Sequence, residues 1–195
     1  MATELLFRED AYQPEAESTV VTVNDRRGIV LDRTVFFATG GGQPGDTGTL
    51  VRPGAPPIAI ATTVYGEDKS EVVHVPGEDQ PLPEPGETLK AAIDWDRRHR
   101  LMRVHTALHL LSVVLPFPVT GGQIGPEEGR LDFDIDGEMP AKEEIEERIN
   151  ALVSADYAVT DEWITDEELA ARPEMVRTMK VKPPMGQGRV RLIRI

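Results

Sequence analysis

The stretch Asp94–Phe117, DWDRRHRLMRVHTALHLLSVVLPF, is where the chain changes from one sequence pattern to another. Its apolar residues recur at the spacing of one helical face, at Leu101, Val104, Leu108 and Leu111. Asp94 or Asp96 can cap the start of this helix, because a carboxylate accepts hydrogen bonds from first-turn amides. Pro116 and Pro118 end it, since proline cannot donate a helical hydrogen bond. The stretch therefore predicts a long helix.

Upstream of this helix, the chain alternates between short apolar stretches and turns. From Thr19 to about Ile93 the stretches are rich in Val, Ile, Thr and Phe, as is typical of strands: STVVTVN, GIVLD, RTVFFA, GTLVR, IAIATTVY, SEVVHV and ETLKAAID. Glycine and proline separate them. We expect a small β-barrel or sandwich of about six short strands in this half of the chain.

Downstream of the helix, strand and helix patterns alternate. The segments GGQIGPEEGRLDFDID, AVTDEWIT and GRVRLIRI read as strands, and residues 140–155 predict an amphipathic helix. TDEELAAR begins with the capping-box pair Thr165 and Glu168. The predicted fold class is therefore α+β, with a barrel domain over residues 1–93 and a second domain over residues 94–195.

Composition excludes several classes of protein. The 195 residues include no cysteine, so they can form neither a disulfide framework nor a thiolate metal site. No secretory signal opens the chain and no apolar run is long enough to span a membrane, so we expect a cytoplasmic protein without a membrane partner. The net charge of −13 disfavours nucleic acid. Two basic clusters, around residues 97–103 and 180–194, could nevertheless guide a polyanion, or could be salt-bridged surface.

Two histidines in the helix are the candidate metal ligands. His105 and His109 lie four residues apart, so both rings can face one point, as two imidazole ligands of a zinc ion do. The alternative is a pair of histidines hydrogen-bonded inside a core. We interpret the other two histidines, His74 and His99, as structural or surface residues.

A glycine-rich stretch, TGGGQPGDTG at residues 39–48, is the second candidate site. Its members are Gly40, Gly41, Gly42, Gln43, Gly45 and Asp46. Its glycines fit the GxGxxG dinucleotide pattern, but a helix must follow such a loop and here a turn and a strand follow. We reject nucleotide binding. What remains is a backbone open to close approach, or simply a tight β-turn.

Four motifs in one order carry a family resemblance. They are LDRTVFFATGGGQPGDTG (31–48), IDWDRRHRLMRVHTALHLLS (93–112), GGQIGPEEGRLDFDI (121–135) and PPMGQGRVRLIRI (183–195). From about residue 19 to its end, the chain resembles the editing domain of alanyl-tRNA synthetase and the freestanding AlaX-type trans-editing proteins. The resemblance implies a small β-barrel followed by the α/β two-layer editing domain that threonyl- and alanyl-tRNA synthetases share.

The function that the resemblance implies is hydrolysis of the ester in mischarged tRNA(Ala), which carries chiefly serine, or glycine. It implies Zn²⁺ as cofactor, with His105 and His109 as two ligands. Gln123 corresponds to the glutamine beside the amino-acid pocket, and Thr106 lies between the ligands at the pocket edge. A glutamine side chain, with one donor and one acceptor group, suits recognition of the serine hydroxyl. We expect the acceptor-end phosphates to meet four arginines of the helix: Arg97, Arg98, Arg100 and Arg103.

One departure from the family bears on the metal. The remaining ligands in the family come from a Cys-x-x-x-His motif that follows the strand corresponding to GRVRLIRI, and the present sequence stops at Ile195. Either the natural chain continues, which we expect, or the metal site has been lost. Two alternative functions stay open. One is a non-catalytic tRNA-binding module without its metal, and the other is a zinc-dependent hydrolase of small esters.

Overall fold

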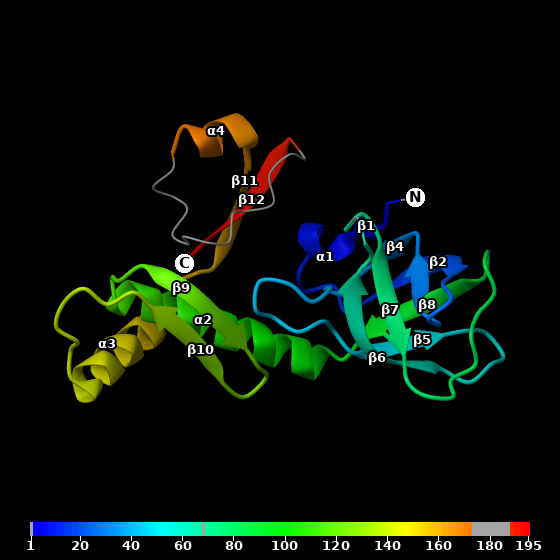
Figure 1. Cartoon of the computed structure of the whole chain (residues 1–195), viewed down its shortest axis with the longest axis horizontal. Coiled ribbons are helices and arrows are strands. Elements are labelled where there is room, and N and C mark those ends of the chain that lie inside the picture. Colours follow the sequence, from blue (N-terminus) through cyan, green and yellow to red (C-terminus); the bar gives the residue numbers. More distant parts are fainter. Residues whose placement is uncertain (1, 68, 173–187) are drawn as a thin grey trace. The chain divides into compact units, whose positions relative to one another are not determined.

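The computed structural model describes residues 2–67, 69–172 and 188–195 (Figure 1). The described chain forms two compact units. One consists of residues 1–102 with Ile124–Glu127, and the other of Arg103–Gln123 with residues 128–195. The change from strand to helix falls between Ile93 and Trp95, and the division into compact units falls further on, within the helix.

A closed six-stranded barrel forms the centre of the first unit. The strands follow one another around it in the order β2–β3–β7–β6–β5–β8, and every neighbouring pair is antiparallel. Their bounds are β2 (Glu15–Val23), β3 (Ile29–Leu31), β5 (Gly48–Val51), β6 (Ile58–Tyr65), β7 (Val72–Pro76) and β8 (Thr88–Ile93). Closure leaves no unpaired edge, which stabilises a small sheet of short strands. The predicted barrel is confirmed.

The interior of the barrel is filled by branched side chains and one aromatic ring. The completely buried residues include Ile29, Leu31, Phe36, Leu50 and Ile58. They come from four successive segments of the chain, and the alternation of buried and exposed positions along β6 and β8 places one face of each strand inward. Burying such side chains contributes about 1.5–3 kcal/mol each.

The predicted strand RTVFFA is only partly correct. Just two of its residues form a strand, β4 (Arg33–Thr34), which pairs in parallel with β1 (Glu4–Leu5) outside the barrel. The short helix α1 (Leu6–Glu9) follows β1. Beyond Thr34, side chains take the backbone donors that a strand would use. Phe36 N–H donates to the Thr34 hydroxyl and Phe37 N–H to the Asp46 carboxylate. The segment leaves the sheet for that reason.

The second unit combines helices with two-stranded sheets. Its elements are β9 (Val119–Ile124), β10 (Gly129–Phe133), α3 (Lys142–Ser154), β11 (Thr160–Thr165), α4 (Asp166–Ala170) and β12 (Arg189–Arg194). β9 pairs with β10, and β11 pairs with β12 in antiparallel register. The predicted capping box is confirmed, because Thr165 and Glu168 exchange hydrogen bonds between side chain and backbone at the start of α4. With the barrel, these elements confirm the α+β class.

Helix α2 (Trp95–Val114) contributes residues to both units. In the second unit, β10 approaches it so closely that only glycine fits at position 129. A Cβ there would lie 2.8 Å from Val104 and 3.0 Å from Leu108. The apolar face predicted from the spacing of these residues is therefore the face that packs. No helix in the described part of the chain is long and apolar enough to cross a membrane.

The C-terminal basic cluster is neutralised by its own sheet. Arg191 pairs with Asp161 at 3.0 Å and Arg194 with Glu162 at 3.1 Å, both across the β11–β12 ladder. The guanidinium of Arg189 lies 4.2 Å from the centroid of the Trp163 ring. The two lysines of this cluster, Lys180 and Lys182, lie outside the described residues. The described arginines thus support the salt-bridged interpretation rather than the polyanion one.

His74 is a structural residue, as its strand position suggested. It is completely buried in β7, and its ring meets Phe36 edge-to-face with centroids 5.0 Å apart. Nδ1 lies 3.0 Å from the Ile29 carbonyl and Nε2 lies 2.8 Å from the Thr34 hydroxyl. Because a carbonyl only accepts, Nδ1 carries the proton and Nε2 accepts from Thr34. Burial lowers the pKa of His74 to about 4, against a smaller raising effect of the Ile29 carbonyl.

This pKa makes a prediction about stability and pH. Between about 6.5, the ordinary value, and about 4, the unfolded chain binds a proton at His74 and the folded chain does not. The free energy of unfolding should therefore fall as the pH is lowered through this range, by at most about 1.4 kcal/mol per pH unit from this group, and should not depend on it above the range. In His74→Gln, whose amide keeps a donor and an acceptor, this component should vanish. Urea unfolding at several pH values measures the difference, and parallel pH profiles for both proteins would contradict it.

Candidate functional site

The helix that carries the candidate ligands, α2, is capped at its N-terminal end by Asp94. The Asp94 carboxylate accepts a hydrogen bond of 3.1 Å from Arg97 N–H, which is the N-cap interaction expected of one of the two predicted capping residues. Asp94 N–H in turn donates to the Thr47 carbonyl at 2.8 Å. The start of α2 is thereby joined to the end of the glycine-rich stretch.

The glycine-rich stretch contains a tight turn. Gly40 and Gln43 exchange two backbone hydrogen bonds of 3.0 Å, and between them Gly41 and Gly42 adopt φ values of +59° and +80°. Residues other than glycine rarely adopt the left-handed conformation at two successive positions. Gly41 and Gly42 are exposed, and a Cβ on Gly41 would meet nothing within 4 Å. The stretch thus forms the tight turn predicted from its glycines, and the backbone at the tip of this turn is accessible.

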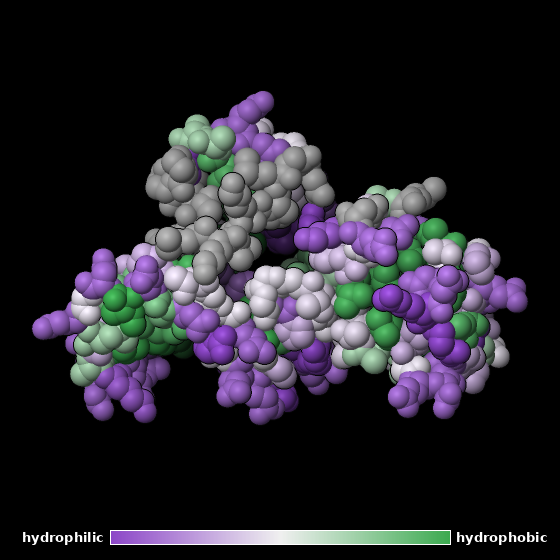
Figure 2. Space-filling view, viewed as in Figure 1, coloured by the Kyte–Doolittle hydropathy of each residue, from purple (hydrophilic) through white to green (hydrophobic). Residues whose placement is uncertain are grey.

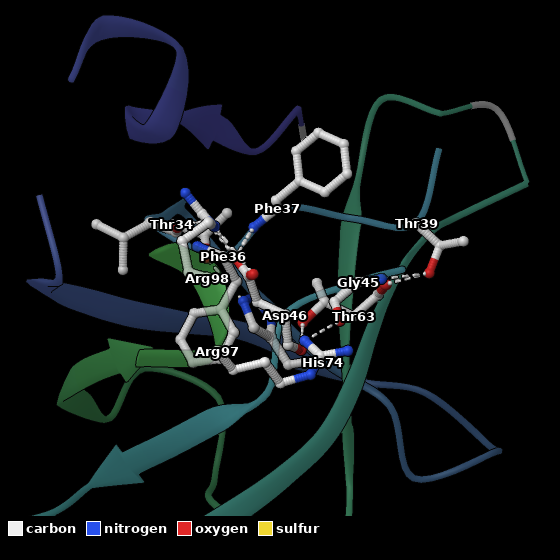
Figure 3. Close-up of polar contacts among 11 residues, drawn as sticks. Thr34, Phe36, Phe37, Thr39, Gly45, Asp46, Thr63, His74, Arg97 and Arg98 are labelled. Atoms are coloured by element: carbon white, nitrogen blue, oxygen red, sulfur yellow. Dashed lines mark hydrogen bonds and ion pairs between the residues drawn. The ribbon is translucent and has the colours of Figure 1, made fainter. Parts of the chain in front are cut away.

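Below its tip, the stretch is bonded into the barrel (Figure 3). Thr39 N–H and the Thr39 hydroxyl both donate to the Thr63 carbonyl, and the same hydroxyl accepts from Gly45 N–H. Gly45 lies so close to β6 that a Cβ would come within 1.9 Å of the Thr63 oxygen. The Thr63 hydroxyl donates to the Asp46 carbonyl at 2.9 Å. Two threonines therefore hold the base of the stretch on the sheet.

A buried ion pair joins this stretch to α2 (Figure 3). Arg98 Nε lies 2.9 and 3.0 Å from the two carboxylate oxygens of Asp46, and Nη2 donates to Asp46 and to the Val35 carbonyl. The Asp46 carboxylate also accepts from Phe37 N–H at 2.7 Å. The two side chains are only 4% and 2% exposed. Each charge is therefore both paired and hydrogen-bonded, as a charge removed from water must be.

This pair corrects one prediction. Arg98 was expected to contact phosphates of tRNA, but its guanidinium is buried against Asp46 and cannot reach a phosphate. The helical position explains the difference. Arg98 lies one turn before Leu101, which is completely buried, so both side chains point into the barrel unit.

The other three arginines differ in accessibility. Arg97 donates to the Gly45 carbonyl at 3.0 Å, and Arg100 pairs with Glu127 at 3.4 Å with both side chains mostly exposed. Arg103 is exposed. An ion pair as open as that of Arg100 contributes little and exchanges partners easily. These three arginines keep surface that an anion could contact.

His105 and His109 lie side by side on α2. Their ring centroids are 4.9 Å apart with an angle of 22° between the planes. Both residues are exposed, next around the helix from the face that packs on β10. The two histidines are therefore not packed inside a core, and their role as metal ligands stays a prediction.

The electrostatics of the pair suit metal binding. Although His105 is exposed as a residue, desolvation of its ring, followed by the charge of His109, lowers the pKa of His105 to about 4. The imidazole is then neutral at neutral pH, which is the form that binds a metal ion. Two adjacent imidazoles can occupy two positions of a zinc ion, whose sites use three or four protein ligands. Within the described residues, no three His, Asp or Glu side chains form a group that could hold a metal.

The two remaining predicted residues lie in the second unit. Gln123 is exposed near the end of β9, and Thr106 is half-buried on α2 beside His105. The residue that follows Gln123 is anchored, since Ile124 is buried and its N–H donates to the Gly42 carbonyl at 2.8 Å. The glycine turn thus fixes the backbone at Ile124.

The supporting residues of the loop were not found from the sequence. Thr39, Thr63 and Val35 hold the glycine-rich stretch or Arg98, and none of them belongs to a recognisable motif. Asp46 was noticed only as a member of the stretch. An aspartate within a buried glycine-rich turn is a signal that a cation must lie nearby, but nothing in a single sequence identifies Arg98 as that cation.

A shallow apolar depression lies elsewhere in the second unit. Its lining includes Val113, Val114, Ala151, Leu152 and Tyr157, with Arg148 at one side. Figure 2 shows hydrophobic surface gathered over the α3 region. None of the predicted site residues lines this depression, so it does not belong to the candidate site.

Comparison with known proteins gives consistent matches. Residues 8–97 match the family model of class II (A) tRNA synthetases. The chain is 35% identical over 186 residues to the alanyl-tRNA editing protein AlaX-M of Methanosarcina mazei, covering 91% of this chain and 74% of that protein. It is 34% identical to AlaX-M of Pyrococcus horikoshii, covering 93% and 82%. The chain belongs to the AlaX family of alanyl-tRNA editing proteins.

The same family resemblance extends to a synthetase. The alanine–tRNA ligase of Methanothermobacter thermautotrophicus is 35% identical over 179 residues, which are 88% of this chain but 19% of the ligase. The match therefore concerns one part of the ligase, whereas the AlaX-M proteins match over most of their length. This agrees with the predicted relation to the freestanding members of the family.

The buried ion pair yields a stability prediction. Arg98→Met leaves the Asp46 carboxylate buried without its cation, so the free energy of unfolding should fall by about 3–5 kcal/mol. Urea unfolding measures this. The exposed pair Arg33–Glu4, with side chains 48% and 56% exposed, provides the control, and Arg33→Met should change the same quantity by less than about 1 kcal/mol. Equal effects of the two substitutions would contradict the importance of the buried pair.

Proposed function

We propose that the protein hydrolyses the ester of mischarged aminoacyl-tRNA(Ala), chiefly seryl-tRNA(Ala), as a trans-editing deacylase of the cytoplasm. Membership of the AlaX family supports the reaction class and the tRNA. The observation that carries the proposal to particular residues is the pair of adjacent exposed imidazoles on α2. An aminoacyl ester is already activated, so its hydrolysis needs chiefly a positioned water and stabilisation of the developing oxyanion.

In this proposal, His105 and His109 are two of the ligands of a Zn²⁺ ion. A zinc ion held there would act as a Lewis acid or orient the ester. The chain's own contribution is to keep both imidazoles on one helical face, with His105 neutral at neutral pH because of its low pKa. The further ligands would come from outside the described residues.

Gln123 is the residue we propose for recognition of serine. Accepting serine while rejecting alanine depends on a single hydroxyl group, and a side chain that pairs with this hydroxyl can discriminate strongly. The amide of Gln123 offers both a donor and an acceptor, and its backbone is held by the bond from Ile124 to the glycine turn. Thr106, beside His105, would line the edge of the same pocket. The exposed arginines Arg100 and Arg103, with the half-buried Arg97, would contact tRNA phosphates.

Deacylation assays test this function. Seryl-tRNA(Ala) and alanyl-tRNA(Ala) are incubated with the protein, and we expect rapid loss of serine only, abolished by a zinc chelator. His105→Ala should lower the rate at least about 100-fold and lower the zinc content measured by mass spectrometry. In Gln123→Ala, the preference for serine over alanine should shrink about tenfold, as expected for one lost hydrogen bond.

The control is Ser112→Ala on the same helix, which should keep both rate and zinc. Loss of neither amino acid while the tRNA is still bound would favour a non-catalytic tRNA-binding module. Hydrolysis of small free esters at a comparable rate would favour a general zinc-dependent hydrolase. Either result would overturn the proposed function.

The phosphate contacts make a separate prediction. Arg103→Gln should weaken binding of tRNA(Ala) and reduce the slope of log affinity against log salt by about 0.7–0.9, the value for one neutralised phosphate. Fluorescence anisotropy at several salt concentrations measures the slope. Arg33→Gln, a change of the same charge on β4, should leave it unaltered. An unchanged slope in Arg103→Gln would remove this arginine from the interface.

A further inference from the structure

Three aromatic rings form a contiguous surface at the start of α2. Trp95 packs against the barrel core and is partly buried. Its ring stacks with that of His99, one helical turn on, at 5.7 Å between centroids and 18° between planes. The Trp95 ring also contacts the ring of Tyr12, with 5.5 Å between centroids and 52° between planes. His99 is exposed and Tyr12 is 63% exposed. The barrel thus supports one ring, and that ring supports two accessible ones.

The exposed ring of Tyr12 is held in place by its backbone. Tyr12 N–H donates to the Asp10 carboxylate at 2.8 Å, and Asp10 N–H donates to the Leu6 carbonyl at 3.0 Å at the end of α1. A single exposed hydrophobic residue on a surface needs no explanation. A ring fixed by a turn, tilted against an anchored indole and left open on its outer side is a different arrangement, because it offers a preorganised π surface.

The charges around these rings restrict what can bind there. Asp10, Asp94 and Asp96 border the cluster, so phosphate groups are disfavoured directly against it. Arg100, the residue after His99, is 60% exposed in a loose pair with Glu127. An uncharged nucleobase can therefore stack on Tyr12 while the phosphate attached to its sugar lies toward the Arg100 side.

The charge of the whole chain points the same way. There are 34 acidic residues against 21 basic ones, Arg98 is buried, and the described arginines of β12 are paired or stacked within their own sheet. Because acidic residues outnumber basic ones, electrostatic attraction alone provides weak RNA binding. An RNA-binding chain of this composition needs an uncharged contribution, and stacking of unpaired bases on aromatic rings is such a contribution.

We propose that Tyr12, Trp95 and His99 form a stacking surface for an unpaired nucleobase of RNA, with Tyr12 as the ring that the base contacts. The proposal rests on the proposed function for the identity of the RNA, a tRNA whose single-stranded 3′ end carries the ester. It adds a binding residue in the barrel unit, outside the metal-ligand helix face and the glycine-rich stretch.

The test compares two RNA hairpins of the acceptor stem that carry no amino acid. One keeps its single-stranded 3′ end and the other is blunt. For Tyr12→Ala, we expect the dissociation constant of the overhang hairpin to rise about tenfold or more, as for the loss of one stacked base. The blunt hairpin should bind as it does to the unchanged protein. Because stacking releases no counterions, the salt slope should stay the same.

Two variants control for loss of the ring and loss of structure. Tyr12→Phe keeps the ring and should keep the affinity for the overhang. Tyr157→Ala removes a tyrosine of nearly equal exposure, 60%, from the second unit and should change nothing. Thermal unfolding checks that each variant is folded. Unaltered overhang binding in Tyr12→Ala, or equal weakening for both hairpins, would overturn the proposal.

The outcome is separable from that of the proposed function. A protein that binds the overhang through Tyr12 but hydrolyses no aminoacyl-tRNA keeps the stacking surface and loses the editing reaction. A protein that releases serine from seryl-tRNA(Ala) but binds both hairpins equally well after Tyr12→Ala keeps the reaction and loses the stacking surface.

Discussion

The ion pair between Arg98 and Asp46 is the interaction on which the arrangement of the first unit depends. It joins the start of α2 to the glycine-rich stretch, and the same carboxylate holds the backbone at Phe37. A buried pair of this kind adds little net stability compared with apolar packing, but losing one partner is severe. Its value therefore lies in specificity, because only one placement of the stretch and the helix satisfies both charges.

The sequence predicted those parts of the structure that depend on local patterns. Alternating β-branched residues, glycine and proline indicated the barrel strands, the periodicity of Leu101 to Leu111 indicated α2, and Thr165 with Glu168 marked a helix start. Parts decided by side chains distant in sequence were missed. Phe36 and Phe37 look like strand residues, yet bonds from Thr34 and Asp46 remove them from the sheet. Arg98 looks like a surface cation for the same reason, since its partner lies 52 residues away.

The candidate site shows the same division between local and distant information. The four-residue spacing of His105 and His109 determines that their rings are adjacent on a helix, and the structure confirms this. The family resemblance, rather than any pattern, indicated Gln123, and the bond from the neighbouring Ile124 to the Gly42 carbonyl could not be predicted from the sequence. The roles of threonines 39 and 63 could not be predicted, because a threonine that bonds a backbone carbonyl is common in any barrel.

The distribution of basic residues finally determines how an acidic chain can approach RNA. Among the described arginines, Arg98 is buried in the first unit, Arg191 and Arg194 pair with acidic side chains of β11, and those at positions 97, 100 and 103 keep accessible surface on α2. Because acidic residues outnumber basic ones by 34 to 21, long-range attraction would act weakly and non-specifically bound RNA would dissociate readily. Affinity for RNA must then come largely from short-range contacts such as stacking and hydrogen bonds, which depend on the shape of the RNA end as well as on its charge.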